Sequence, residues 1–136
     1  MIYSNNKIRL QYTVPTKIIF IAREKKAMYF NQDLEEVEYF NPNKTILGMF
    51  KSIYKLNEMS KESYEIKIKS GVIELIIKDL LVEDLNSFSI IFQNNPVVLK
   101  KIQWEALDGK STFAFYNINR SVKIGKKTFN LANPLL

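Results

Sequence analysis

The chain contains no cysteine and no histidine among its 136 residues, and only four glycines and four prolines. Without cysteine and histidine there is no disulfide framework, no thiol chemistry and no zinc site of the usual kind. The missing histidine also excludes a Ser-His-Asp triad and removes the commonest general base. A lack of cysteine is compatible with the cytosol and with the periplasm alike.

Long hydrophobic runs are absent as well. The longest, Ile18 to Ala22, is far shorter than the ~18 apolar residues that a membrane-spanning helix needs. The first residues, Met1 to Lys7, lack the basic start, the apolar stretch and the small-residue cleavage site of a signal peptide. As written, the sequence predicts a soluble chain without a targeting segment.

The composition is that of an ordinary globular protein, with 46% apolar and 25% charged residues. A length of 136 residues suits one domain, which can bury roughly two-thirds of the surface of its unfolded chain. Twenty Lys and Arg residues against 14 Asp and Glu residues give a net charge of +6. This excess of positive charge leaves anionic partners open as a possibility.

Alternating apolar and polar residues predict many short strands. Ile8, Leu10 and Tyr12 alternate with polar neighbours up to Pro15. The strands expected from this pattern cover residues 7–13, 17–22, 27–30, 34–40, 64–69, 72–78, 88–92, 97–106 and 111–116, with an edge segment at 129–136. The strand at 17–22 is apolar on both faces, which predicts cover on both sides. Asp108-Gly109 is the strongest hairpin signal in the chain.

The period changes to that of a helix after Phe40. Asn41 is suited to cap a helix, and Pro42 to occupy its first position. Apolar residues then follow at helical spacing, which predicts one short amphipathic helix over residues 42–58. Gly48 weakens this helix by ~1 kcal/mol relative to alanine. The resulting architecture is mainly β (α+β), an antiparallel meander of four strands, a helix and about five strands.

Five stretches of the sequence, taken in order, resemble one protein family. They are Lys7 to Pro15, Lys25 to Leu34, Asn43 to Phe50, Leu99 to Phe115 and Phe129 to Pro134. Each stretch alone is mostly apolar residues and turns, and their joint order carries the resemblance. The chain is similar to the periplasmic outer-membrane lipoprotein carrier proteins, the LolA family.

The resemblance implies a curved antiparallel sheet, or incomplete β-barrel, with a short helical lid. It implies a single domain over 1–136 that lacks the signal peptide, N-terminal helix and first strands of the family. The missing helix and the lid would then cover the two faces of the strand at 17–22. It further implies a monomeric periplasmic carrier that takes acylated lipoproteins from an inner-membrane lipoprotein-releasing transporter and passes them to an outer-membrane acceptor. Such a carrier needs no covalent chemistry, cofactor, metal or nucleic acid.

The candidate site is the apolar wall of this curved sheet together with its lid. The expected ligand-binding residues are Ile8, Leu10, Tyr12, Ile18, Phe20, Met28, Phe30, Phe88, Ile90, Phe92, Ile102 and Trp104. The expected lid residues are Ile46, Leu47, Met49, Phe50 and Ile53. Periodicity alone explains every one of these positions equally well as ordinary protein core.

Other functions fit parts of the sequence. A sensor or structural module on the same fold would have the same apolar pattern. A nucleic-acid-binding β domain would explain the positive charge, but its aromatics should interleave with lysines on one face. Lysine pairs such as Lys25-Lys26 and Lys126-Lys127 are explained either as solvated edges or as a basic surface for an anionic partner. No nucleophile-elbow or paired-acid context supports a hydrolase.

Overall fold

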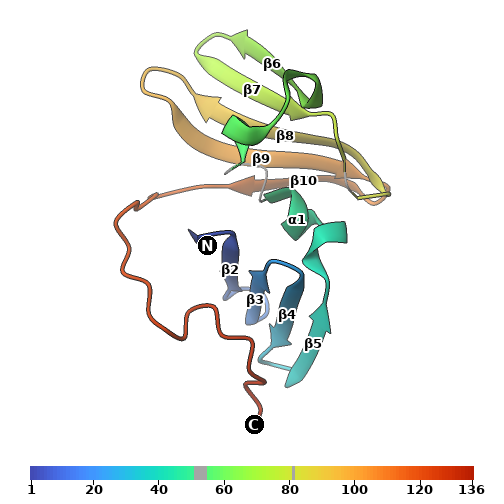
Figure 1. The fold of residues 1–136 in the computed structure, drawn as a ribbon, viewed down its shortest axis with the longest axis vertical. Helices are drawn as coiled ribbons and strands as arrows, with labels where there is room; N and C mark the ends of the chain where they lie inside the picture. Colours follow the sequence, from blue (N-terminus) through green and yellow to red (C-terminus); the bar gives the residue numbers. More distant parts are fainter. Residues whose placement is uncertain (51–54, 81) are drawn as a thin grey trace. The chain divides into compact units, whose positions relative to one another are not determined.

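The computed structural model describes residues 1–50, 55–80 and 82–136. The chain forms two compact units, whose elements are labelled in Figure 1. Unit 1 combines Met1–Lys51 with Val122–Leu136, and unit 2 is Ser52–Ser121. Each unit contains one antiparallel sheet of five strands. The mainly β meander predicted from the sequence is confirmed, and the single domain over 1–136 stays a prediction.

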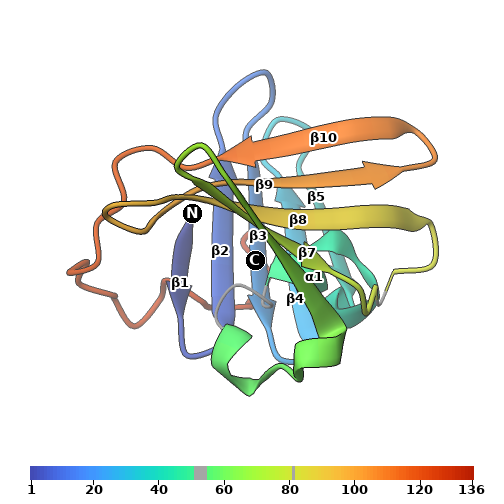
Figure 2. The same ribbon diagram turned by 90° about the horizontal axis from the view of Figure 1, so that it is seen from above.

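Five consecutive strands form the sheet of unit 1 in the order β1-β2-β3-β4-β5, and they lie side by side in Figure 2. Their bounds are β1 Ile2–Ser4, β2 Lys7–Tyr12, β3 Ile18–Arg23, β4 Lys26–Asn31 and β5 Glu36–Phe40. The four expected strands correspond to β2 through β5, and β1 is additional. A two-residue turn joins β1 to β2, because Asn5 and Asn6 both take positive φ angles, 47° and 62°.

Cross-strand register divides the side chains of this sheet between two faces. Leu10 pairs with Phe20, and Ile21 pairs with Met28, so the two pairs point to opposite faces. The first face, here called the wall face, is defined by Ile8, Leu10, Tyr12, Ile18 and Phe20. The second, here called the covered face, is defined by Ile19, Ile21, Met28 and Phe30.

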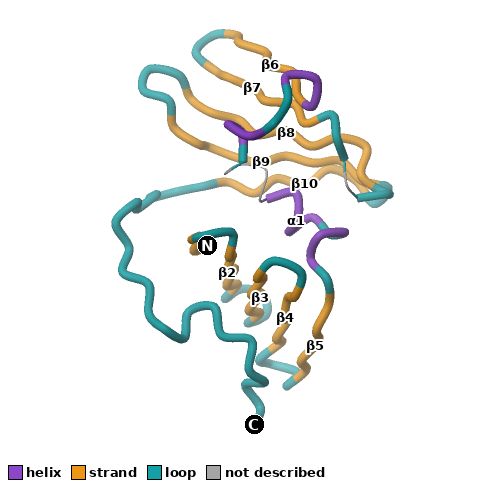
Figure 3. Tube along the Cα trace, viewed as in Figure 1, coloured by secondary structure: helices purple, strands orange, loops and turns teal. Residues whose placement is uncertain are grey.

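The C-terminal segment, residues 122–136, lies against the covered face. Phe129 is buried in one cluster with the four residues that define this face, and Leu131 packs beside it. The guanidinium of Arg9 donates a hydrogen bond to the carbonyl oxygen of Thr128 (3.1 Å), and the Tyr39 hydroxyl donates one to that of Leu131 (2.9 Å). The segment is drawn as loop throughout in Figure 3.

The expectation of an edge strand in this region is therefore wrong. Residues 129–136, all of which the structure describes, contain no strand. Their attachment comes from a buried side chain and two side-chain hydrogen bonds instead of a backbone ladder. The strand at 17–22 was expected to be covered by the lid and by the N-terminal helix of the family, and this stays a prediction; within the described chain, Phe129 and Leu131 pack on its covered face.

The helix expected over 42–58 is interrupted in the part of this range that the structure describes, and residues 51–54 lie outside the described residues. Asn41 caps the first, η1 (Pro42–Lys44), by accepting a hydrogen bond from the backbone N–H of Asn43 at 3.0 Å, as predicted. Thr45 is extended, with φ −120° and ψ 170°, and this conformation ends η1 before α1 begins. Among the described residues, the further helical elements are α1 Ile46–Phe50, η3 Leu56–Glu58 and η4 Lys61–Ser63.

Unit 2 contains the second sheet, in the order β10-β9-β8-β7-β6. Its strands are β6 Tyr64–Lys69, β7 Val72–Ile77, β8 Leu85–Gln93, β9 Val98–Ala106 and β10 Gly109–Ala114. All five expected strands are confirmed, although β8 begins at Leu85, inside the turn expected there. The hairpin at Asp108-Gly109 is also confirmed, with Gly109 at φ 122° and paired with Ala106.

One face of the unit 2 sheet is apolar across all five strands. The register runs from Ile66 on β6 through Leu75, Ile90 and Ile102 to Phe113 on β10. These side chains and their neighbours two residues away form what is here called the apolar face of unit 2. The opposite face carries pairs such as Lys67–Glu74 and Ile91–Lys101 and is largely polar.

No helix in the part of the chain that the structure describes has both the length and the apolar character needed to cross a membrane.

Candidate functional site

Burial decreases along the wall face from one end of β2 to the other. Ile8 and Leu10 are 1% and 4% exposed, whereas Tyr12 is 41% exposed. On β3, Ile18 and Phe20 are half-buried. The first two residues are therefore buried, and the other three leave apolar surface accessible.

Aromatic rings line the accessible part of this face. The ring of Phe20 lies 6.3 Å from that of Tyr12, edge to face, and 5.1 Å from that of Tyr29. Burial raises the pKa of the Tyr12 phenol above its ordinary value of 10.0, because the phenolate would lose hydration there. The Tyr12 side chain is thus partly withdrawn from water, although it is still 41% exposed.

The structure separates Met28 and Phe30 from the other wall residues. Alternation shows which residues of one strand share a face, but only the turn decides which set matches the neighbouring strand. The two-residue turn after Arg23 pairs that residue with Lys26, and this register sends Met28 and Phe30 to the covered face. Their placement on the wall is therefore wrong. Both residues line a pocket of about 350 Å³ under the C-terminal segment instead.

The five expected wall residues of the second half share the apolar face of unit 2. Phe88 pairs with Trp104, and Ile90 with Ile102, while Phe92 lies two residues beyond Ile90 on the same strand. Phe88, Ile90 and Ile102 are fully buried at 0% exposure, whereas Phe92 and Trp104 are half-buried. The first three are therefore inaccessible, and the last two leave part of their rings accessible.

Two accessible isoleucines on this face were missed. Ile66 and Ile68 of the edge strand β6 are 53% and 66% exposed, and they pair with Leu75 and Ile73. Their alternation with Glu65, Lys67 and Lys69 was visible in the sequence and placed them on one face. The signal that could have identified them is that their strand is followed directly by a strand with apolar residues, Ile73 and Leu75, which pair with them.

The expected lid residues fall on α1 and beyond it. Met49 and Phe50 are buried, at 1% and 2% exposure. Ile46 and Leu47 belong to α1 by their backbone, but their side chains lie outside what the structure describes, as does the whole of Ile53. Accessible surface on α1 is therefore not provided by Met49 or Phe50.

Gly48 brings α1 close to the preceding turn. A Cβ atom at this position would lie 2.8 Å from the carbonyl oxygen of Pro42 and 2.9 Å from that of Asn43. The glycine that weakens the helix in isolation is thus required by the close approach of η1 and α1.

Comparison with known proteins identifies the family. The sequence profile described as "Outer membrane lipoprotein carrier protein LolA" matches residues 1–132. No curated protein matches the chain. Proteins of the LolA family are periplasmic lipoprotein carriers and not enzymes, and the family fold is an incomplete β-barrel with a lid. Because the match extends over nearly the whole chain, this protein belongs to the LolA family, as its five sequence motifs predicted.

Proposed function

We propose that this protein is a periplasmic carrier that binds the acyl chains of lipoproteins on its apolar strand faces and delivers them to the outer membrane. Membership of the LolA family supports lipoprotein carriage in general. The observation that carries the finer proposal is the combination of buried and accessible apolar residues on one face of each sheet. A protein core alone would not leave isoleucines such as Ile68 two-thirds exposed on such a face.

Acyl binding requires apolar surface that water can leave. Each methylene group that moves out of water contributes ~0.8 kcal/mol, so one long chain binds firmly without polar contacts. The accessible residues are the proposed acyl contacts of each sheet taken by itself: Tyr12, Ile18 and Phe20 in unit 1, and Ile66, Ile68, Phe92 and Trp104 in unit 2. The buried residues Ile8, Leu10, Phe88, Ile90 and Ile102 lie on the same two faces, beside these contacts.

The lid function remains assigned to the region around α1. The proposed lid residues are Ile46, Leu47, Met49, Phe50 and Ile53. Met49 suits this role because its unbranched thioether adapts to differently shaped neighbours. Movement of α1 would change the burial of Met49 and Phe50, and their exposure would increase when cargo enters.

The partners follow from the same proposal. Acylated lipoproteins are the cargo, an inner-membrane lipoprotein-releasing transporter is the donor, and an outer-membrane protein is the acceptor. Binding by burial of apolar surface requires no cofactor and no bond to be made or broken. Transfer then depends on the acceptor offering the acyl chains a larger apolar surface than the carrier does.

A lipopeptide-binding assay tests this function. The full chain is titrated with a triacylated, fluorescently labelled lipopeptide, and Ile66→Ser is compared with Val72→Ser. The two side chains have similar exposure, 53% and 44%, but Val72 pairs with Lys69 and therefore lies on the opposite face of the sheet. We expect several-fold weaker binding for the Ile66 variant and unchanged binding for the Val72 variant.

Equal affinities for the two variants, or no lipopeptide binding by the unmodified chain, would contradict the proposal. The expected difference also separates specific binding on the apolar face from general adhesion of lipid to hydrophobic surface. Circular dichroism of both variants establishes that each is folded before the affinities are compared.

A further inference from the structure

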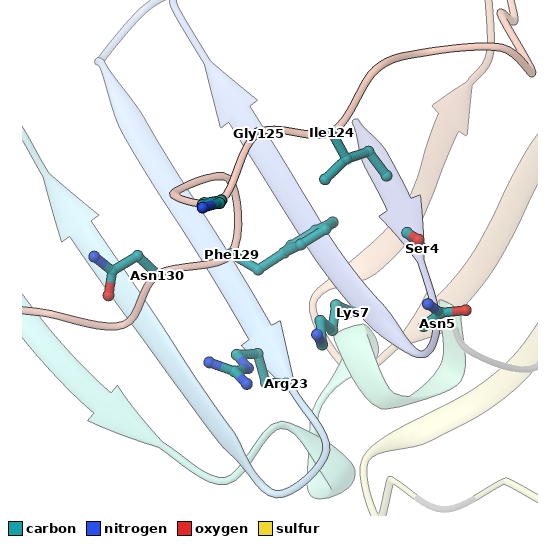
Figure 4. Close-up of a pocket in the computed structure, with 9 residues that line it drawn as sticks. Ser4, Asn5, Lys7, Arg23, Ile124, Gly125, Phe129 and Asn130 are labelled. Atoms are coloured by element: carbon teal, nitrogen blue, oxygen red, sulfur yellow. The ribbon is translucent and has the colours of Figure 1, made fainter.

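A second pocket in unit 1 differs in character from the apolar faces. It encloses about 370 Å³ between the β1–β2 turn, the end of β3 and the C-terminal segment. Figure 4 shows Lys7 and Arg23 at one side of this pocket, Asn5 at its rim, and the Phe129 ring extending between the strands and the C-terminal segment. Its size is at the lower end of the range for small-molecule sites.

Positive charge is concentrated in this pocket. Lys7, Arg23 and Lys126 all line it, and no Asp or Glu of the described chain does so. Lys7 and Arg23 are directly opposite each other on neighbouring strands, an arrangement of like charges that destabilises a sheet. The next cation in the same row, Lys26, lies with its ammonium 4.9 Å from the centre of the Tyr39 ring. Lys7 and Arg23 therefore lie next to each other on the strand side of the pocket.

The sequence of the segment that closes the pocket strengthens this charge. Over residues 122–136, the part of this segment that belongs to unit 1, there is no Asp or Glu, and three Lys residues are present. Lys126 lines the pocket itself, and Lys127 lines the neighbouring one under the same segment. An unneutralised cluster of this kind attracts anions.

The walls of the pocket are fixed independently of any ligand. Arg9 holds the carbonyl of Thr128, and Phe129 is buried against the sheet, so Lys126 is held near the strands. On the other side, the Tyr3 hydroxyl donates to the Asn6 side chain at 2.9 Å and accepts from its backbone N–H at 3.2 Å. A site with fixed walls loses little conformational entropy when it binds.

We propose that this pocket binds the phosphate group of a small phosphate ester or of a phospholipid head group. Arginine offers a planar fork of donors that matches two phosphate oxygens, and lysine adds compact charge. A phosphate dianion compensates three cations better than a single carboxylate does. The rings and methyl groups of Phe129 and Ile124 provide an apolar wall for a short carbon skeleton attached to the phosphate.

Phosphate binding is tested on the full chain in moderate salt. Inorganic phosphate and glycerol 3-phosphate are titrated into the ¹⁵N-labelled protein, and amide shifts are followed at residues 4–7, 23 and 124–130. The double variant Lys7→Gln/Arg23→Gln is compared with Lys69→Gln/Lys100→Gln, which loses the same charge from exposed positions of unit 2. We expect at least about tenfold weaker binding in the pocket variant and no more than twofold change in the control.

Vesicle sedimentation distinguishes the two sources of the phosphate. If the ligand is a head group, the protein sediments with phosphatidylglycerol vesicles but not with phosphatidylcholine vesicles, and the pocket variant loses this binding. If the ligand is a soluble ester, glycerol 3-phosphate binds in the pocket and neither vesicle does. Both results support the pocket as a phosphate site.

The proposal is overturned if phosphate shifts no amide around the pocket, or if both double variants weaken binding equally. Acetate or an acidic peptide binding as tightly as phosphate would also overturn it, because that result describes an unselective basic surface. Should the double variant not fold, Arg23→Lys replaces it: charge is kept and the fork is lost, so binding should weaken several-fold. This test uses no acylated cargo, so its outcome is independent of the carrier function.

Discussion

Truncation of Phe129 to alanine should release the C-terminal segment from unit 1. Phe129 is 8% exposed and packs against Ile19, Ile21, Met28 and Phe30. Removal of a buried phenylalanine ring costs about 3–5 kcal/mol, because the transfer free energy is lost and a cavity remains. The hydrogen bonds to the carbonyls of residues 128 and 131 contribute about 1 kcal/mol each. The aromatic ring is therefore the largest single anchor of this segment.

The loss of stability should be visible locally and globally. At about 1.4 kcal/mol per factor of ten, the population of the open segment should rise by about a hundredfold to several thousandfold. Trypsin cleavage after Lys126 and Lys127 and hydrogen exchange at the amide of Asn130, which donates to the carbonyl of Lys127, both report this opening. The melting temperature of the whole chain should fall by roughly 10 °C.

Tyr116→Ala is the matched control, because this aromatic side chain is 83% exposed. Its truncation should change stability by no more than about 0.5 kcal/mol. If the Phe129 variant keeps its resistance to trypsin and loses less than about 1 kcal/mol, the segment does not serve as the cover of this face. The packing of Phe129 on the covered face of unit 1 would then have to be rejected.

Three further predictions, one of them with Gly125→Ala as its control, concern other parts of the structure. Gly48→Ala should destabilise the protein by about 1–3 kcal/mol in urea unfolding, because its Cβ would approach the Pro42 carbonyl oxygen to 2.8 Å; a helix without this contact would gain stability instead. The raised pKa of Tyr12 stabilises the folded state below pH 10, and this contribution to stability should be lost as pH rises through the folded-state pKa. The melting temperature of the wild-type chain should therefore fall over this alkaline range, and this part of the fall should be absent in Tyr12→Phe. Gly109→Ala should cost about 1–3 kcal/mol because of its φ of 122°, whereas Gly125→Ala, without positive φ or a close neighbour, should unfold at nearly the wild-type urea concentration.

Strict alternation was sufficient to locate strands. The run from Tyr64 to Lys69 was expected as a strand and matches β6 residue for residue. Local turn chemistry served equally well at Asp108-Gly109. The turn at Asn5-Asn6 carried a comparable signal and was overlooked, so β1 was missed. These features were predictable because neighbours within a few residues determine them.

The faces of the sheet were less predictable than its strands. Assigning Met28 and Phe30 to the wall required the register between β3 and β4, which alternation within each strand does not contain. One residue more or less in the turn after Arg23 would have reversed the result. The broken helix has a similar cause, since the extended Thr45 interrupts a stretch whose apolar spacing favoured continuity.

The C-terminal segment shows how a long-range contact leaves an incomplete signal in a sequence. The two-sided apolar strand at 17–22 required a second layer over Ile19 and Ile21, and this requirement was recognised. Phe129 is the single aromatic residue of 117–136, yet no periodicity marks it as buried. In the sequence, the strand face with Ile19 and Ile21 had no cover assigned to it from the C-terminal segment, and Phe129 had no assigned packing partner. Pairing the two would have predicted the contact that the structure shows. The same pairing would have placed Lys126 near the cations of β2 and β3, because burial of the Phe129 ring also sets the position of the neighbouring Lys126. In unit 1, the packing of Phe129 against the sheet therefore both covers the apolar strand face and forms one wall of the proposed phosphate site.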